Sequence, residues 1–311
     1  MVGPLSLMLP LAASPLRSTG TLQLGGGACC TRSAMIWPVA SEICPATARS
    51  PALSRRGLLA ALASTSSVSL TPRSAAAAKP SFDAVTRGAF EAFTSGDYAK
   101  AEAEWRKAST VLPNEPLVWI NFGTCLVIVA SDAMTLGVKP LGKPAEQLRE
   151  ALAAFDTAER LGSSDALLLN SRGNAFGLLQ EWKEARTAYE ASAAVSPRDF
   201  ESIPRSNSAL VSFELGELSA AESEASKIIR RDPRFVDATA LLAAIRWKTG
   251  DVGGAVRAFE RLCEEPMFCR RYANDEVVIG RWTPKAVDAY RQLLQEPGIK
   301  LALKNGAAGL R

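Results

Sequence analysis

The segment 137–144 is the part of this chain that comes closest to a known ligand-binding motif. It reads GVKPLGKP, which fits the G-x-x-x-x-G-K opening of a nucleotide-binding P-loop. However, Pro144 stands where that motif needs a Ser or Thr hydroxyl for magnesium, and two prolines remove backbone amides that would hold phosphate. No strand-helix-strand pattern surrounds the segment. We therefore interpret it as a surface loop or a helix extension, and we predict no cofactor.

Side chains suited to catalysis are scarce elsewhere in the sequence. The chain has no histidine, which is the commonest general base and metal ligand, so Ser-His-Asp triads and His-containing zinc sites are excluded. Charged pairs such as Glu264-Glu265 and Arg230-Arg231 are interpreted as solvated helix ends, where cations suit a C-terminus. We predict no catalytic residue and no metal ligand. A hydrolase that uses two converging carboxylates remains as an alternative of another class.

The elements that would position any site are best predicted from an internal repeat of about 34 residues. Small residues recur at positions 8 and 20, Gly at 15, an aromatic residue at 24 and Pro at 32. Small residues let two helices approach closely, Gly permits a tight turn, and Pro stops the second helix. The pattern predicts five helical hairpins at about 82–115, 116–165 with an insertion at 127–143, 166–199, 202–235 and 236–269, then a cap at 282–294 and a tail at 297–311.

This pattern resembles the tetratricopeptide-repeat (TPR) family, and the first unit carries it most fully. Gly96, Ala101, Trp105 and Pro113 occupy motif positions there, and Thr283 is expected to cap the final helix at its N-terminus. The resemblance implies an all-α fold, a right-handed superhelical solenoid of about five TPR hairpins with a C-terminal capping helix. Departures from the motif are the insertion, Met267 in place of Pro, and Arg205 at position 4 of the fourth unit.

The resemblance also implies a protein-binding surface, because first-helix positions 2, 5, 9, 12 and 13 line the concave face in this family. Most of these positions are apolar here, which favours an amphipathic helix or an apolar peptide as the ligand. The chaperone-type carboxylate clamp fails, since Asp237 and Leu241 stand where cations are needed. An alternative is that the insertion or the C-terminal tail covers this face. The predicted residues are Phe90, Phe93, Ile120, Val127, Ile128, Asn170, Asn174, Leu178, Leu210, Phe213, Trp247 and Lys248.

Two cysteines near the end of the repeats, Cys263 and Cys269, leave two interpretations open. They form a disulfide between the fifth unit and the cap, or they are buried free thiols, since spacing alone does not show that their Cβ atoms meet.

Residues 1–78 have the composition of a targeting leader, rich in Ala, Ser, Leu, Pro and Arg. Of the 36 basic and 32 acidic residues of the chain, six and one lie in this leader, which leaves 30 and 31 for the remainder. The positive charge therefore belongs to the leader, and the repeat region has no basic footprint for nucleic acid. No apolar run is long enough to span a bilayer, so no stable membrane insertion is expected.

The sequence SRRGLL around Arg55 and Arg56, followed by an apolar stretch and by Ala76 and Ala78, looks like a twin-arginine export signal. Such a signal after a transit-like segment resembles the leaders of thylakoid-lumen proteins, including small TPR proteins of that compartment. The resemblance implies a chloroplast lumenal scaffold or assembly factor that binds other proteins. A mitochondrial adaptor or structural subunit is the alternative if the Arg pair is accidental.

Overall fold

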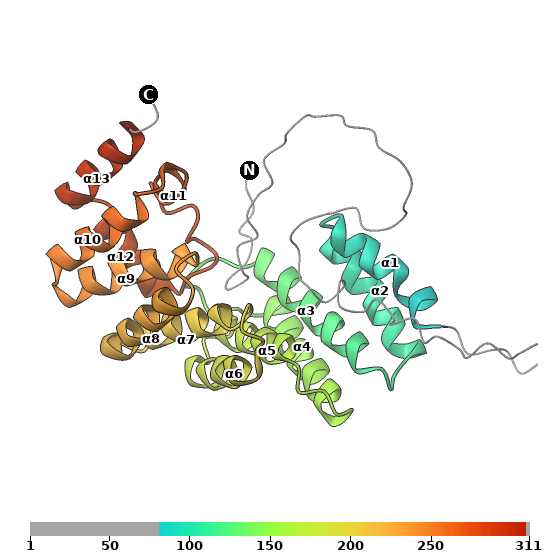
Figure 1. Cartoon of the computed structure of the whole chain (residues 1–311). Helices are drawn as coiled ribbons and strands as arrows, with labels where there is room; N and C mark the ends of the chain where they lie inside the picture. The colour runs from blue at the N-terminus through green and yellow to red at the C-terminus, as the bar shows by residue number, and fades with distance from the viewer. Residues whose placement is uncertain (1–80, 309–311) are drawn as a thin grey trace, which may run out of the picture. The chain divides into compact units, whose positions relative to one another are not determined.

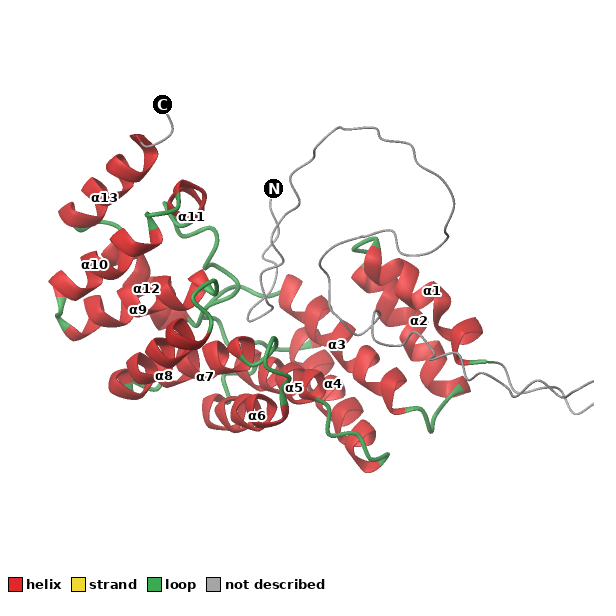
Figure 2. Cartoon of the chain, viewed as in Figure 1, coloured by secondary structure: helices red, strands yellow, loops and turns green. Residues whose placement is uncertain are grey.

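The computed structural model describes residues 81–308, and within them every regular element is a helix. Figure 2 shows helices joined by loops, with no strand in the described part. The predicted all-α class is therefore confirmed. No helix in this part of the chain combines the length and the apolar character that crossing a bilayer requires.

Ten of the helices form five consecutive antiparallel hairpins, and each hairpin packs on the next (Figure 1). First helices also touch across units, α3 with α5 and α7 with α9, as expected for stacked repeats. The hairpins are α1 (Phe82–Thr94) with α2 (Tyr98–Val111), α3 (Pro116–Asp132) with α4 (Lys143–Arg160), α5 (Ala166–Leu178) with α6 (Trp182–Val195), α7 (Ser202–Glu214) with α8 (Leu218–Arg231), and α9 (Val236–Thr249) with α10 (Val252–Leu262).

Close approach within the second and third hairpins depends on a glycine in each first helix. A Cβ added to Gly123 would lie 2.6 Å from Phe155 Cε1, and one added to Gly173 would lie 2.5 Å from Tyr189 Cε1. Both rings are completely buried. The aromatic ring of the second helix therefore fills the space that a side chain on the first helix would occupy.

Tight turns join the two helices of most hairpins through a left-handed residue. Gly96, Gly216 and Gly250 have φ values of 81°, 82° and 85° at the position where the motif has Gly. In the third unit this position is Gln180, which is the one non-glycine residue with positive φ within 81–308, at 60°. Its side-chain amide donates to the carbonyl of Gly137 at 3.2 Å, so it links the turn to the preceding insertion.

The insertion of the second unit is partly helical, because α3 continues through Asp132 and the connecting loop covers only 133–142. Leu136 in this loop packs on the apolar core of the C-terminal helices. Pro144 lies in the first turn of α4. The P-loop-like segment thus follows a helix, whereas the nucleotide-binding motif follows a strand.

Three further helices follow the hairpins: α11 (Pro266–Arg271), α12 (Pro284–Leu293) and α13 (Pro297–Ala308). α12 packs against α7 and α9, while α13 packs against α10 and α11. Trp282, Tyr272 and Tyr290 are completely buried in the same apolar cluster as the last two hairpins. Thr283 does occupy the N-cap position of α12, but its hydroxyl makes no capping bond and instead donates to the carbonyl of Leu210 at 3.2 Å.

Candidate protein-binding face

The first helices α1, α3, α5, α7 and α9 carry all twelve residues predicted to bind a partner, and we call their shared side the first-helix face. Phe90, Phe93 and Trp247 are half-buried and Lys248 is exposed. The other residues are buried, each less than a tenth exposed: Ile120, Val127, Ile128, Asn170, Asn174, Leu178, Leu210 and Phe213.

Helix α12 covers the first-helix face of the last two hairpins. Leu210 and Phe213 of α7 belong to one buried apolar cluster with Val287 and Tyr290 of α12. The sequence left open a covering of this face by the insertion or by the tail at 297–311. In the fourth and fifth units the cover is instead the capping helix α12, while the tail helix α13 packs against α10 and α11. Leu210 and Phe213 thus pack on another part of the same chain.

Polar contacts fix the N-terminal end of α12 on this face. The buried carboxylate of Glu214 accepts a hydrogen bond from the backbone N–H of Lys285 at 2.9 Å. The ammonium group of Lys285 in turn donates to the backbone carbonyl of Glu214 at 2.6 Å. An acidic side chain that reaches the first N–H groups of a helix stabilises its positive end.

Asp237, at the start of α9, is the main polar anchor of the segment before α12. The residue is only 7 % exposed, and its carboxylate accepts hydrogen bonds from Tyr272 Oη at 2.7 Å, Arg281 Nη2 at 2.8 Å and Trp282 Nε1 at 3.2 Å. Burial, and then the nearby Asp237 carboxylate, raise the pKa of Tyr272 well above its usual value. The residue that breaks the carboxylate-clamp pattern thus serves to hold the chain's own C-terminal segment.

Asn170 and Asn174, which were predicted to contact a ligand, form hydrogen bonds mainly with other residues of the fold. Tyr189 Oη donates to Asn174 Oδ1 at 2.9 Å, and Asn207 Nδ2 donates to Asn170 Oδ1 at 3.1 Å. Asn170 Nδ2 is buried and has no hydrogen-bond partner among the described residues. Asn170 is therefore the member of this group that retains a free donor.

Cys263 and Cys269 form a disulfide, so the interpretation of two free thiols is wrong. Their Cα atoms lie 4.2 Å apart because α10 ends at Leu262 and the chain turns back into α11. Cys125 is the free cysteine of the described region, and burial raises the pKa of its thiol far above the usual range. A nucleophilic thiolate at neutral pH is therefore not available from Cys125.

Residues 81–308, the part of the chain that the structure describes, contain neither a cluster of metal-ion ligands nor the predicted targeting residues. No group of three or more Cys, Asp or Glu side chains there is placed to hold a metal ion. The targeting residues Arg55, Arg56, Ala76 and Ala78 lie outside the described residues.

Sequence reasoning missed two features of the folded region. The contacts of Asp237 with Arg281 and Trp282 join residues 44 and 45 positions apart, which no repeat period relates. The second is a pocket that four arginines from α8, α9 and α10 line. Its only signal in the sequence was a basic pair at the end of α8, which the helix dipole explained equally well.

Stacked antiparallel hairpins with small residues at the contacts, left-handed turns and a C-terminal capping helix define a TPR-like helical repeat protein.

No protein-family model matches the chain, and no curated protein matches it either. Among solved structures it is similar to PilF of Pseudomonas aeruginosa, with 16% identity over 73% of this chain and 96% of that chain and a TM-score of 0.46. MamA, at 18% identity, covers 56% of this chain and 91% of its own with a TM-score of 0.46. YrrB, described as a TPR protein with an unusual peptide-binding site, is 16% identical over 71% of this chain and 90% of its own, with a TM-score of 0.44.

Proposed function

We propose that this protein is a non-catalytic scaffold or assembly factor that binds other proteins through its first-helix face. The observation that supports this most directly is α12, since the chain itself places a short helix on that face. Ala286, Val287, Tyr290 and Leu293 of α12 are buried there. A surface that accepts the apolar side of one amphipathic helix has the chemistry to accept that of another.

A carboxylate-dependent hydrolase finds less support. Such an enzyme needs two acids that converge in a cleft and remain available to substrate. The buried acids Glu214 and Asp237 instead accept hydrogen bonds from the segment that contains α12.

Binding at this face is tested by site-specific photo-crosslinking. A photoreactive phenylalanine analogue at Phe93, half-buried on α1, is compared with the same group at Lys107, which is exposed on the second helix α2. We expect crosslinked protein partners from position 93 that are absent from position 107. Identical adducts from both positions, or none from position 93, would contradict binding through the first-helix face.

We further propose that the mature protein acts in the thylakoid lumen, with the mitochondrion as the alternative address. The support is the leader sequence, with its acid-poor composition, Arg55-Arg56 pair and Ala76–Ala78 site. A fluorescent fusion of residues 1–78 is compared with its Arg55→Lys/Arg56→Lys variant, and Arg17→Lys/Arg49→Lys serves as the control. Loss of lumenal import in the first variant alone is expected. Mitochondrial fluorescence of the unchanged fusion would support the alternative.

A further inference from the structure

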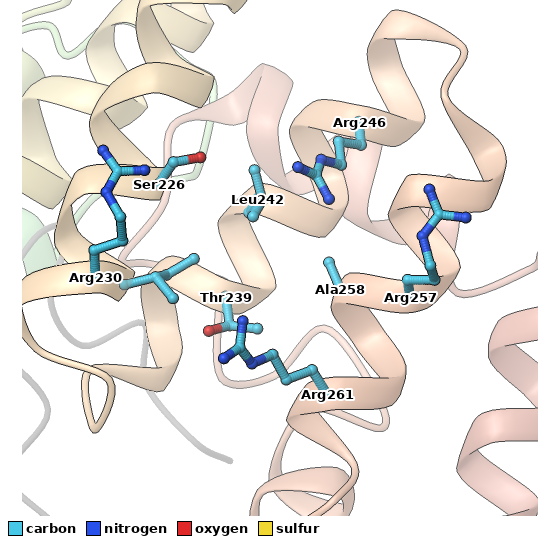
Figure 3. Close-up of a pocket in the computed structure, with 9 residues that line it drawn as sticks. Ser226, Arg230, Thr239, Leu242, Arg246, Arg257, Ala258 and Arg261 are labelled. Carbon is cyan, nitrogen blue, oxygen red and sulfur yellow. The ribbon is translucent and has the colours of Figure 1, made fainter.

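Four arginines line one open pocket of about 300 Å³ between α8, α9 and α10 (Figure 3). Arg230 comes from α8, Arg246 from α9, and Arg257 and Arg261 from α10. Figure 3 shows these side chains distributed around the pocket. No acidic side chain lines it.

The positive charge of this pocket is mostly uncompensated. Arg246 Nε is paired with Glu222 Oε1 at 2.9 Å, which holds that guanidinium in place. Arg230, Arg257 and Arg261 are exposed and form no ion pair with any described residue. By contrast, Arg205 of α7 and Arg231 of α8, which do not line the pocket, both pair with Glu201. Like charges gathered without a counter-charge repel one another, so an anionic ligand is stabilised there.

The floor of the pocket is apolar, with hydroxyl groups beside it. Leu242 and Ala258 form part of the wall, 8 % and 6 % exposed, together with the half-buried Ile229. Ser226 and Thr239 add hydroxyl groups. An isolated phosphate would use the cations but would leave the apolar wall in water, whereas a peptide can bury an apolar side chain and present carboxylates around it.

This pocket is separate from the first-helix face. Its residues on α9 are Thr239, Leu242 and Arg246, which at 100° per residue lie roughly 140 to 200° around the helix from Asp237. Asp237 points toward the segment that leads into α12. The pocket therefore opens on the opposite side of α9 from the surface that α12 covers.

We propose that this pocket is a second docking site, for an acidic peptide segment of a partner protein. An apolar side chain of the segment contacts Leu242 and Ala258, and flanking Asp or Glu carboxylates pair with Arg230, Arg257 and Arg261. Guanidinium groups suit this ligand because their paired N–H donors match carboxylate oxygens. The inference goes beyond the proposed function, because it assigns a different surface and does not depend on binding at the first-helix face.

The test is a titration of the full chain with a fluorescent peptide EEDLEED, followed by fluorescence anisotropy. The neutral peptide QQNLQQN reports on the role of the carboxylates, and pyrophosphate is added as a small anionic competitor. Arg257→Glu/Arg261→Glu reverses two exposed charges of the pocket. Arg87→Glu/Arg149→Glu makes the same change in total charge at exposed residues of the first two hairpins.

We expect the acidic peptide to bind and the neutral one not to bind, with affinity that falls as salt is added. The Arg257→Glu/Arg261→Glu variant should bind at least about tenfold more weakly, while the control double variant stays within about twofold of the unchanged chain. Equal weakening in both variants would indicate attraction by net charge and would overturn the site. Absence of acidic-peptide binding, or pyrophosphate binding as tight as that of the peptide, would overturn the peptide assignment. Crosslinking from position 93 does not depend on any of these outcomes.

Discussion

At the scale of single residues, Asp237 connects two parts of the chain that the repeat does not relate. Asp237 lies on α9, the first helix of the fifth hairpin. Its carboxylate accepts hydrogen bonds from Tyr272, Arg281 and Trp282. The side chains of Arg281 and Asp237 are 12% and 9% exposed. A buried ion pair contributes little relative to an apolar pair, but loss of one partner leaves the other charge unpaired.

The substitution Asp237→Asn should therefore lower the free energy of unfolding by about 3–5 kcal/mol, because Arg281 remains buried without a counter-charge. Urea unfolding followed by tryptophan fluorescence measures this loss. The double variant Asp237→Asn/Arg281→Met should recover part of it. Asp288→Asn, at an exposed position on α12, is the control and should change stability by less than about 0.5 kcal/mol. If Asp237→Asn lowered the free energy of unfolding as little as Asp288→Asn does, the result would contradict the anchoring role of Asp237.

Buried tyrosines should make the protein sensitive to alkali. Burial raises the pKa of Tyr189 well above its usual value, and burial followed by Asp237 does so for Tyr272. Tyrosines in the unfolded chain ionise at about pH 10, while the folded state keeps Tyr189 and Tyr272 protonated. Above about pH 10 the unfolded state therefore binds fewer protons than the folded state. The contribution of the buried tyrosines to the free energy of unfolding is complete below about pH 10 and is lost as the pH rises further.

The measurement is urea unfolding between about pH 8 and pH 11. Tyr189→Phe removes one of these ionisable groups while it keeps the ring against Gly173. Its loss of stability over that range should be smaller than that of the unchanged chain. Parallel curves for both proteins would show that Tyr189 does not contribute.

At the scale of elements, the first helices of the first three hairpins each contain a glycine. The substitution of alanine for glycine should raise stability in the first of these helices and lower it in the other two. A Cβ at Gly88 of α1 would meet Glu104 at an ordinary 3.8 Å, whereas Gly123 and Gly173 each face a ring at less than 3 Å. Gly88→Ala should raise stability by about 0.5–1 kcal/mol, because alanine favours a helix interior. Gly123→Ala and Gly173→Ala should lower it by about 1–3 kcal/mol through overpacking.

Thermal or urea unfolding of the three alanine variants gives the comparison directly, with Gly88→Ala as the matched control. A stabilising effect at all three positions would show that the hairpins do not need the close approach seen at Phe155 and Tyr189.

The disulfide between Cys263 and Cys269 joins the end of α10 to α11, and α13 packs beside it, since a Cβ on Gly306 would lie 2.5 Å from Cys269 Sγ. Reduction should therefore cost about 2 kcal/mol, as expected for a short closed loop. Unfolding with and without a reductant measures this. Cys263→Ala/Cys269→Ala should not respond to the reductant. An unchanged stability of the natural chain after confirmed reduction would contradict the prediction.

Much of the hairpin architecture follows from local patterns in the sequence. α2, α6 and α8 end two residues before Pro113, Pro197 and Pro233, where the motif predicts that the second helix stops. Glycines mark the left-handed turns because few other residues adopt that conformation. Gln180 shows the limit of this rule, since it takes the same conformation in the third unit.

The site was less predictable, for a physical reason. A repeat period describes how each hairpin meets its neighbour, but α12 returns to α7 and α9 across intervening helices. The apolar character of Leu210 and Phe213 fits an external ligand and an internal one equally well. Only the position of α12 shows that these side chains contact an internal helix. No spacing in the sequence predicts that position.

At the scale of the whole molecule, the C-terminal segment closes the end of the repeat stack. Removal of residues 281–311 would uncover Leu210 and Phe213, together with the apolar side of α9. Solenoid ends need a polar covering for solubility. The shortened chain should therefore self-associate, which light scattering after size-exclusion chromatography detects. Removal of 297–311 alone, which keeps α12, is the control. A shortened chain that stays monomeric and folded would show that α12 is not needed as a cover.

The tether of α12 has a consequence for competition. Its N-terminal end follows α11 after twelve residues, 272–283, so the helix is always supplied to the last two hairpins by its own chain. Tyr272, Val278 and Trp282 of this segment are buried, so the segment lies against the fold and keeps α12 close to its site. Even a short flexible tether gives an effective concentration in about the millimolar range, and a free partner at cellular concentration must outcompete a helix that is held at least as closely. A rival helix would enter these two hairpins only if its intrinsic affinity far exceeded that of α12. The same partner helix would not have to compete with α12 at a hairpin that α12 does not contact.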